Sequence, residues 1–149
     1  MRTSRFHILV AVVLLLVGIS ATLWAQDQKS ANQEERAKAI NVVRLINTTE
    51  MWYNMGSKKD ASDAHGRFAS WDELYKSGFV KTVQNHGSMF KDIEVSPGPE
   101  VIPGHRLDLL VSPDGKSYSV ALHDTRDGEG LFSVFSDQTG IIYLGSPLQ

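Results

Sequence analysis

Apolar positions in the first half of the chain follow a helical period. From Gln33 to Met55, apolar side chains return every three or four residues, a spacing that places them on one face of an α-helix. Gly56 then supplies a stop, because glycine readily takes the left-handed conformation that ends a helix. The pattern therefore predicts one long amphipathic helix. Its buried face is predicted to consist of Ala39, Val42, Val43, Ile46, Thr49, Glu50 and Tyr53.

A polar run, Asn47–Glu50, interrupts this apolar face. Projection on a helix places Glu50 between Ile46 and Tyr53, with Asn47 at the rim. A buried carboxylate is unfavourable unless it is hydrogen-bonded. We therefore expect Glu50 to accept bonds from loop backbone N–H groups, or from Ser or Tyr hydroxyls, and so to fasten the loop to the helix.

A second, short helix is predicted by the capping box Ser70-Trp71-Asp72-Glu73. In such a box the Ser70 hydroxyl and the Glu73 carboxylate each accept a bond from an otherwise unpaired backbone N–H. Gly78 lies where a helix over about 71–77 would end. The segment Lys81–Gly104 has no clean period and holds three prolines, so it predicts an irregular connector with one brief strand near Ile93–Val95.

After Gly104 the period becomes two, which is the alternation of β-strands. Turns that combine glycine with aspartate separate the apolar-rich runs 106–112, 117–123, 131–136 and 141–144. Each run has one apolar face, as in Leu107, Leu109 and Val111 or in Tyr118, Val120 and Leu122. The predicted fold class is α+β, with the long N-terminal helix packed on an antiparallel meander of three to four strands and a short second helix.

The first 25 residues have the three parts of a secretory signal peptide. Arg2 and Arg5 give a positive start, Ile8–Val17 is an apolar run, and Ala25 is the small residue at the expected cut. The alternative is an uncleaved N-terminal anchor, because the largely apolar stretch that ends at Ala25 is just long enough to span a bilayer. We expect residues 26–149 to form a single globular domain that is exported, either periplasmic or secreted.

Charge and cysteine content exclude several classes of function. The chain has 15 basic and 17 acidic side chains, and loss of Arg2 and Arg5 leaves 13 and 17, a net charge of −4. An acidic domain gains no attraction to nucleic acid or anionic lipid. No nucleic-acid partner is therefore expected, and a membrane partner only if the N-terminal segment is uncleaved. Cysteine is absent, which excludes disulfides, thiolate metal ligands and cysteine nucleophiles.

Several motifs, in order, match those of a known family. Residues 44–53, RLINTTEMWY, match the R-x-I-N-T-x-E-x-x-Y stretch in the helix of many bacterial pilin-like proteins. Leu74–Val80 is similar to their L-x-x-x-G-hydrophobic segment, Tyr118–Val120 to their Y-x-V strand, and Phe135–Tyr143 to their D-x-x-G-x-I hairpin. The chain thus resembles the globular part of type IV pilins and type II secretion pseudopilins over most of residues 37–145. The resemblance implies a helix-on-sheet fold and envelope or secretion-system proteins as partners.

The N-terminus departs from the prepilin pattern. Prepilins are cut at a glycine that precedes a phenylalanine-led apolar run with glutamate at its fifth position, whereas here Gly18 is followed by Ile19–Leu23 without glutamate. The resemblance therefore implies a pilin-like head on an ordinary export signal. Such a head is expected to bind pilins, minor pseudopilins or another envelope component instead of polymerising.

One loop holds a candidate metal site. Asp124, Asp127 and Glu129 gather the carboxylate oxygens that Ca²⁺ prefers, and some pseudopilins bind calcium in C-terminal loops. The spacing is not that of an EF-hand, and Arg126 lies among the acids, so a solvated polar loop is the other interpretation. A periplasmic calcium- or small-ligand-binding module on the same fold is accordingly the alternative function. No other cofactor is expected.

Catalytic signatures are missing from the sequence. The histidines of the domain lie far apart, and neither a G-x-S-x-G elbow nor a phosphate-binding loop occurs. Asp108 and His123 are placed to pair across adjacent strands, for which a cross-strand salt bridge is the common use. We therefore expect a non-enzymatic protein, with a hydrolase site in the irregular segment 81–104 as a third hypothesis.

Overall fold

The structure is a computed structural model of the chain, and it describes residues 30–56, 65–126 and 131–146. The chain divides into two compact units, Met1–Glu35 and Arg36–Gln149. The predicted signal segment, residues 1–25, lies outside the described residues. Among the helices that are described, none is long and apolar enough to cross a membrane. The hydrophobic core lies entirely within the second unit.

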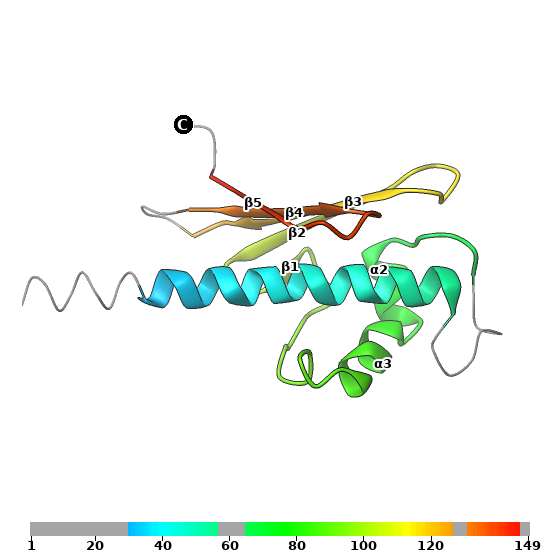
Figure 1. Cartoon of the computed structure of the whole chain (residues 1–149), viewed down its shortest axis with the longest axis horizontal. Coiled ribbons are helices and arrows are strands. Elements are labelled where there is room, and N and C mark those ends of the chain that lie inside the picture. Colours follow the sequence, from blue (N-terminus) through cyan, green and yellow to red (C-terminus); the bar gives the residue numbers. More distant parts are fainter. Residues whose placement is uncertain (1–29, 57–64, 127–130, 147–149) are drawn as a thin grey trace, which may run out of the picture. The chain divides into compact units, whose positions relative to one another are not determined.

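The described elements are a long helix, two short helices and one antiparallel sheet (Figure 1). The long helix covers residues 30–55. The remaining elements are α2 (Trp71–Lys76), α3 (Phe79–His86), β1 (Glu100–Ile102), β2 (His105–Val111), β3 (Tyr118–Asp124), β4 (Ser133–Asp137) and β5 (Tyr143–Gly145). The five strands pair in chain order, each antiparallel to the next. The predicted α+β fold is confirmed, with five strands in place of three or four.

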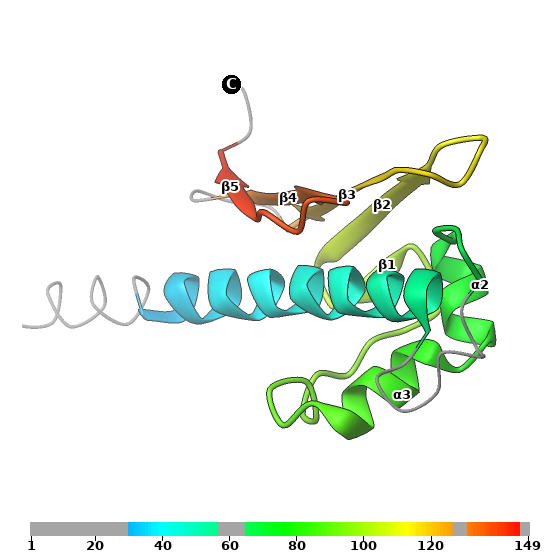
Figure 2. The same ribbon diagram turned by 45° about the vertical axis from the view of Figure 1, so that its right-hand side comes forward.

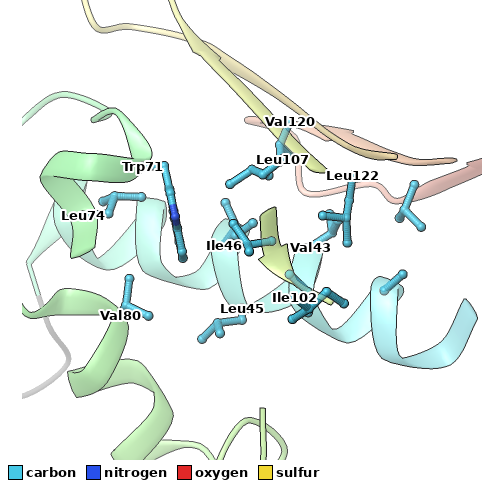
Figure 3. Packing of buried hydrophobic residues seen from close by; sticks show 14 of the residues in the cluster. Val43, Leu45, Ile46, Trp71, Leu74, Val80, Ile102, Leu107, Val120 and Leu122 are labelled. Carbon is cyan, nitrogen blue, oxygen red and sulfur yellow. The ribbon is translucent and has the colours of Figure 1, made fainter. Parts of the chain in front are cut away.

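The register of the sheet brings the predicted apolar positions together on one face. Leu107 lies opposite Leu122 and Leu109 opposite Val120 in the β2–β3 pair. In both views of the second unit, this sheet lies on one side of the long helix and α3 on the other (Figures 1 and 2). Figure 3 shows Val43 and Ile46 of the helix pointing toward the side chains of Leu107 and Leu122. Burial of these apolar side chains, at roughly 25 cal/mol per Å², is the main force that holds helix and sheet together.

The long helix is buried on two sides, and the sequence predicted only one. Every residue of the predicted buried face is indeed buried, and Leu45 is fully buried as well. Figure 3 shows Leu45 turned away from Val120, toward the side of the helix where Val80 of α3 lies. The second buried side follows from α3, because this helix covers a surface that the predicted fold left in solvent.

Helix α3 corrects the prediction of an irregular connector from Lys81 onward. It spans eight residues, and only Val80 and Val83 among them are fully buried, so it is too short to show a helical period in the sequence. Gly78, with φ of 81°, separates α2 from α3, in the left-handed conformation that the sequence predicted.

The brief strand predicted near Ile93–Val95 is also wrong, because the strand of this region lies later, at β1. The Ile93 N–H donates to the Phe90 carbonyl at 3.1 Å, which holds the chain in a turn there. The Ser96 N–H then donates to the Val101 carbonyl at 2.9 Å, and pairing with β2 begins at β1. The two apolar residues at 93 and 95 still pack against the core, which explains their strand-like pattern.

Candidate functional site

Glu50 is fully buried in the long helix, and the loop before α2 satisfies one of its carboxylate oxygens. The backbone N–H of Ala69 donates to Oε2 of Glu50 at 3.0 Å. This is the kind of bond that the sequence predicted, since Ala69 lies in the segment that follows the helix. In the part of the chain that the structure describes, Oε1 has no hydrogen-bond partner. The carboxyl group is therefore only half satisfied.

Burial with a hydrogen bond to only one carboxylate oxygen raises the pKa of Glu50. Loss of hydration raises the pKa of its carboxyl group from 4.5 to about 7, because burial disfavours the charged form. The Ala69 bond lowers this pKa and the negative charge of Glu73 raises it, but both effects are smaller than that of burial. Glu50 is thus a buried acid that exchanges its proton near neutral pH.

Hydrogen bonds connect the end of the long helix to α2 through Tyr53, Arg67 and Glu73. The Tyr53 hydroxyl and the Arg67 guanidinium both donate to the Glu73 carboxylate, and a further bond joins Arg67 Nη1 to Glu73 Oε2 at 3.1 Å. The bond from Arg67, followed by that from Tyr53, lowers the pKa of Glu73. Burial, helped by the bond to Glu73, raises the pKa of Tyr53 to about 12. Glu73 stays ionised and Tyr53 stays neutral at physiological pH.

Ser70 caps α2 as predicted, since its hydroxyl accepts the Glu73 backbone N–H at 3.4 Å. The other half of the predicted capping box is wrong: no bond from the Ser70 N–H to the Glu73 carboxylate occurs in the described segment around α2. Arg67 takes that carboxylate instead. A charge-assisted bond to a guanidinium is stronger than a bond to a neutral backbone N–H, so Glu73 turns toward the long helix.

Asn47 joins the long helix to the sheet. Its Nδ2 donates to Ser136 Oγ in β4 at 2.8 Å, and its Oδ1 accepts the Tyr118 hydroxyl of β3 at 2.9 Å. Ser136 Oγ in turn donates to the Ile141 carbonyl at 2.9 Å, which fixes the turn before β5. The sequence placed Asn47 at the rim of the buried face but gave it no partner, because both partners lie far along the chain.

A groove of about 340 Å³ lies beside this bridge. The long helix supplies Met51 and Met55 to its lining, and the turn between β4 and β5 supplies Gln138 and Thr139. None of the lining residues is an acid or a base. The groove is therefore an uncharged surface with amide and hydroxyl groups beside methionine side chains.

The calcium prediction rests on a loop that is only partly described. Asp124 ends β3, and its side chain is only 2% exposed. Arg126 occupies both of its oxygens, with Nε 2.9 Å from Oδ1 and Nη2 2.7 Å from Oδ2. Asp127 and Glu129 lie outside the described residues, and the described ranges hold no group of three metal-ligating side chains. The site thus stays a prediction, and a calcium ion would have to displace Arg126 from Asp124.

The face of the sheet opposite the buried one carries rows of side chains that cross the strands. This surface, termed the outer face, consists of Arg106, Asp108, Leu110, Ser119, Ala121, His123, Ser133, Phe135, Asp137, Tyr143 and Gly145. In its middle row Asp108 lies opposite Ala121, Ala121 opposite Phe135, and Phe135 opposite Tyr143. Leu110 is 69% exposed, Tyr143 58% and Phe135 40%, so large apolar side chains meet solvent here.

A hollow of about 450 Å³ lies on the outer face. Leu110, Phe135 and Tyr143 line it together with the small side chains of Ser119 and Ala121. The small residues of β3 lie between larger residues of β2 and β4, and this difference in side-chain size produces the hollow.

Three polar groups of the outer face form a hydrogen-bonded chain. Ser133 Oγ lies 2.9 Å from His123 Nδ1, and His123 Nε2 lies 3.3 Å from Asp108 Oδ2. The pair of Asp108 and His123 is the cross-strand contact that the sequence predicted, but it is diagonal, because His123 lies directly opposite Arg106. Ser133 is only 8% exposed, so a substrate carbonyl has little access to its hydroxyl. These hydrogen bonds between Ser133, His123 and Asp108 are therefore better explained as a structural connection between β2, β3 and β4 than as a catalytic nucleophile with its base.

The sequence did not predict the exposed apolar part of the outer face or the hydrogen bond between Ser133 and His123. A signal was present, because strict alternation fails where large apolar residues are consecutive, as at Leu109 and Leu110 and at Val134 and Phe135. Consecutive apolar residues in a strand place one of the two on each face.

Comparisons of the chain with protein-family models, with curated proteins and with solved structures give no match.

Proposed function

We propose that this protein is an exported component of the cell envelope that acts through protein–protein contacts, in the manner of pilin-like and pseudopilin-like proteins, and not through catalysis. The observation that carries the proposal is the set of exposed apolar side chains on the outer face: Leu110, Phe135 and Tyr143. Contiguous exposed apolar side chains on a soluble domain are typical of an interaction surface.

The contacts of the pilin-like motif support the same proposal. Asn47, Glu50 and Tyr53 of the RLINTTEMWY stretch each bond to a residue outside their own helix. These bonds attach the long helix to the strand meander and to the loop before α2. The motif therefore supports a shared architecture, and the function is assigned to the surface that this architecture presents.

A purification from envelope extract of the native host tests the proposal. Leu110→Ser together with Tyr143→Ser removes two exposed apolar side chains, and Met89→Ser serves as a control because Met89 is 61% exposed outside the outer face. We expect pilus or secretion-system proteins to co-purify with the wild-type chain and the control but not with the double variant. All three chains should melt at similar temperatures, since the substituted side chains are exposed.

Recovery of the same proteins with all three chains would mean that the outer face is not the contact surface. Recovery of no pilus or secretion-system component with the wild-type chain would contradict the proposed function itself.

A further inference from the structure

The hollow on the outer face combines aromatic rings with carboxylates, and the histidine that also lines it, His123, already pairs with Asp108. Phe135 and Tyr143 supply the rings, and Asp108 and Asp137 supply the acids. Neither lysine nor arginine is among its lining residues. Aromatic faces and carboxylates both attract cations, so the hollow has the chemistry of a site for a positively charged group.

Each of the two carboxylates keeps one oxygen for a further partner. Oδ2 of Asp108 receives Arg106 at 3.1 Å and His123 at 3.3 Å, and within the described ranges no bond reaches its Oδ1. Oδ1 of Asp137 receives the Thr139 N–H at 2.8 Å and the Thr139 hydroxyl at 2.6 Å, and no described group bonds its Oδ2. These bonds to Thr139, that of the hydroxyl first, lower the pKa of Asp137, so the second acid is ionised at neutral pH.

The spacing of the two acids favours an extended cation over a metal ion. Asp108 lies in β2 and Asp137 in β4, with β3 between them. Neighbouring strands are about 4.8 Å apart, and Asp137 lies two residues along β4 from Phe135, which is in the row of Asp108, so the backbones that carry the acids are roughly 12 Å apart. That span is too wide for a single metal ion to bind both carboxylates, whereas an arginine combines a long apolar stem with a flat head that stacks on rings and pairs with carboxylates.

We propose that the hollow binds an arginine side chain presented by a partner protein. The stem of the arginine lies over Ala121 and beside Leu110, and its guanidinium reaches the Phe135 and Tyr143 rings and one of the free carboxylate oxygens. Arg106 of this chain already binds Asp108 from the neighbouring row, so this acid accepts a guanidinium in this setting. The inference rests on the proposed function, because it names the chemistry of the partner at the same surface.

Titration of the isotope-labelled full chain with short peptides, followed by NMR, tests this inference. The probe is acetyl-Gly-Arg-Gly-amide, and the comparison peptide carries citrulline, which keeps the shape of arginine without its charge. We expect the arginine peptide to shift the resonances of Ala121, Phe135 and Tyr143, with affinity at least about fivefold above that of the citrulline peptide.

Two variants locate the site. Asp137→Asn keeps the acceptor for Thr139 but removes the charge, and it should weaken arginine binding by about fivefold. Asp72→Asn, a change to an exposed acid on α2, should leave the binding unchanged. Equal binding of both peptides, or shifts spread away from the hollow, would overturn the inference.

Shifts that depend on protein concentration without any peptide would also overturn it, in favour of a second copy of this chain on the outer face. Failure here is separate from failure of the proposed function. If Leu110→Ser with Tyr143→Ser abolishes recovery of envelope proteins while the arginine peptide does not bind, the contact surface stands and only its arginine specificity is lost.

Discussion

The carboxyl group of Glu50 holds the loop before α2 through the backbone N–H of Ala69, and in doing so it gives up its hydration. Its pKa is 4.5 in the unfolded chain and about 7 in the folded one, so between these values the folded chain binds the proton more strongly. The stability that follows from this difference is fully present below about pH 4.5 and is lost as the pH rises through about 7. The sign is opposite to that of an acid in a salt bridge.

Glu50→Gln should remove this pH dependence while keeping an acceptor for the Ala69 N–H. Between pH 5 and pH 8 the wild-type free energy of unfolding should fall by about 2 kcal/mol more than that of the variant. Glu50→Leu has no acceptor and leaves the Ala69 N–H unpaired, so it should be less stable than Glu50→Gln by about 1–3 kcal/mol. Urea denaturation at both pH values measures all three chains.

The same pH profile for wild type and Glu50→Gln would mean that the carboxyl group titrates normally and is therefore hydrated. Small and equal losses for both substitutions would indicate an exposed side chain.

At the residue scale, the sequence predicted the burial of Glu50 and the type of its partner, because helical spacing fixes which side chains share a face. It did not predict that Glu73 would leave its capping position for Arg67, since that choice depends on a guanidinium six residues away in a loop. Local motifs name the candidate bonds, and tertiary contacts decide between them.

At the scale of elements, Asn47 is the main polar connection between the long helix and the sheet. Asn47→Ala should leave the Tyr118 hydroxyl and one position at Ser136 without a partner, and it should lower the free energy of unfolding by about 1–3 kcal/mol. The neighbouring Thr48→Ala is a matched control, because that half-buried hydroxyl bonds only the Arg44 carbonyl of its own helix in the described chain. The control should lie within about 0.5 kcal/mol of wild type.

Thermal and urea unfolding of both variants check this prediction. If Asn47→Ala matches Thr48→Ala in stability, the carboxamide does not join helix and sheet, and apolar packing alone holds them.

The meander could be predicted from the sequence because each turn carries glycine with aspartate and because the runs 107–111 and 118–122 have an apolar residue at every second position. The short elements could not. Helix α3 buries only Val80 and Val83, and β1 has three residues, so neither repeats its pattern often enough to be recognised. The outer face could not be predicted for a related reason. Which side chains of β2, β3 and β4 lie next to one another depends on the register of the strands, which the sequence does not show.

At the scale of the whole second unit, one face of the sheet is apolar and buried, and the other is mixed, with polar side chains around a few large apolar ones. The long helix covers the buried face, and on the other Leu110, Phe135 and Tyr143 remain exposed. An antiparallel sheet needs only one apolar face to fold, so the second is available for contacts with another protein. We therefore propose the outer face as the surface that contacts another protein of the envelope.

Site-specific photo-cross-linking in the native envelope tests whether the outer face makes this contact. A photoreactive phenylalanine derivative replaces Tyr143 on the outer face or, as a control, Lys81, an exposed residue of α3. We expect position 143 to form an adduct with a pilus or secretion-system protein and position 81 to form none. Absence of an adduct at position 143, or equal adducts at both positions, would contradict it.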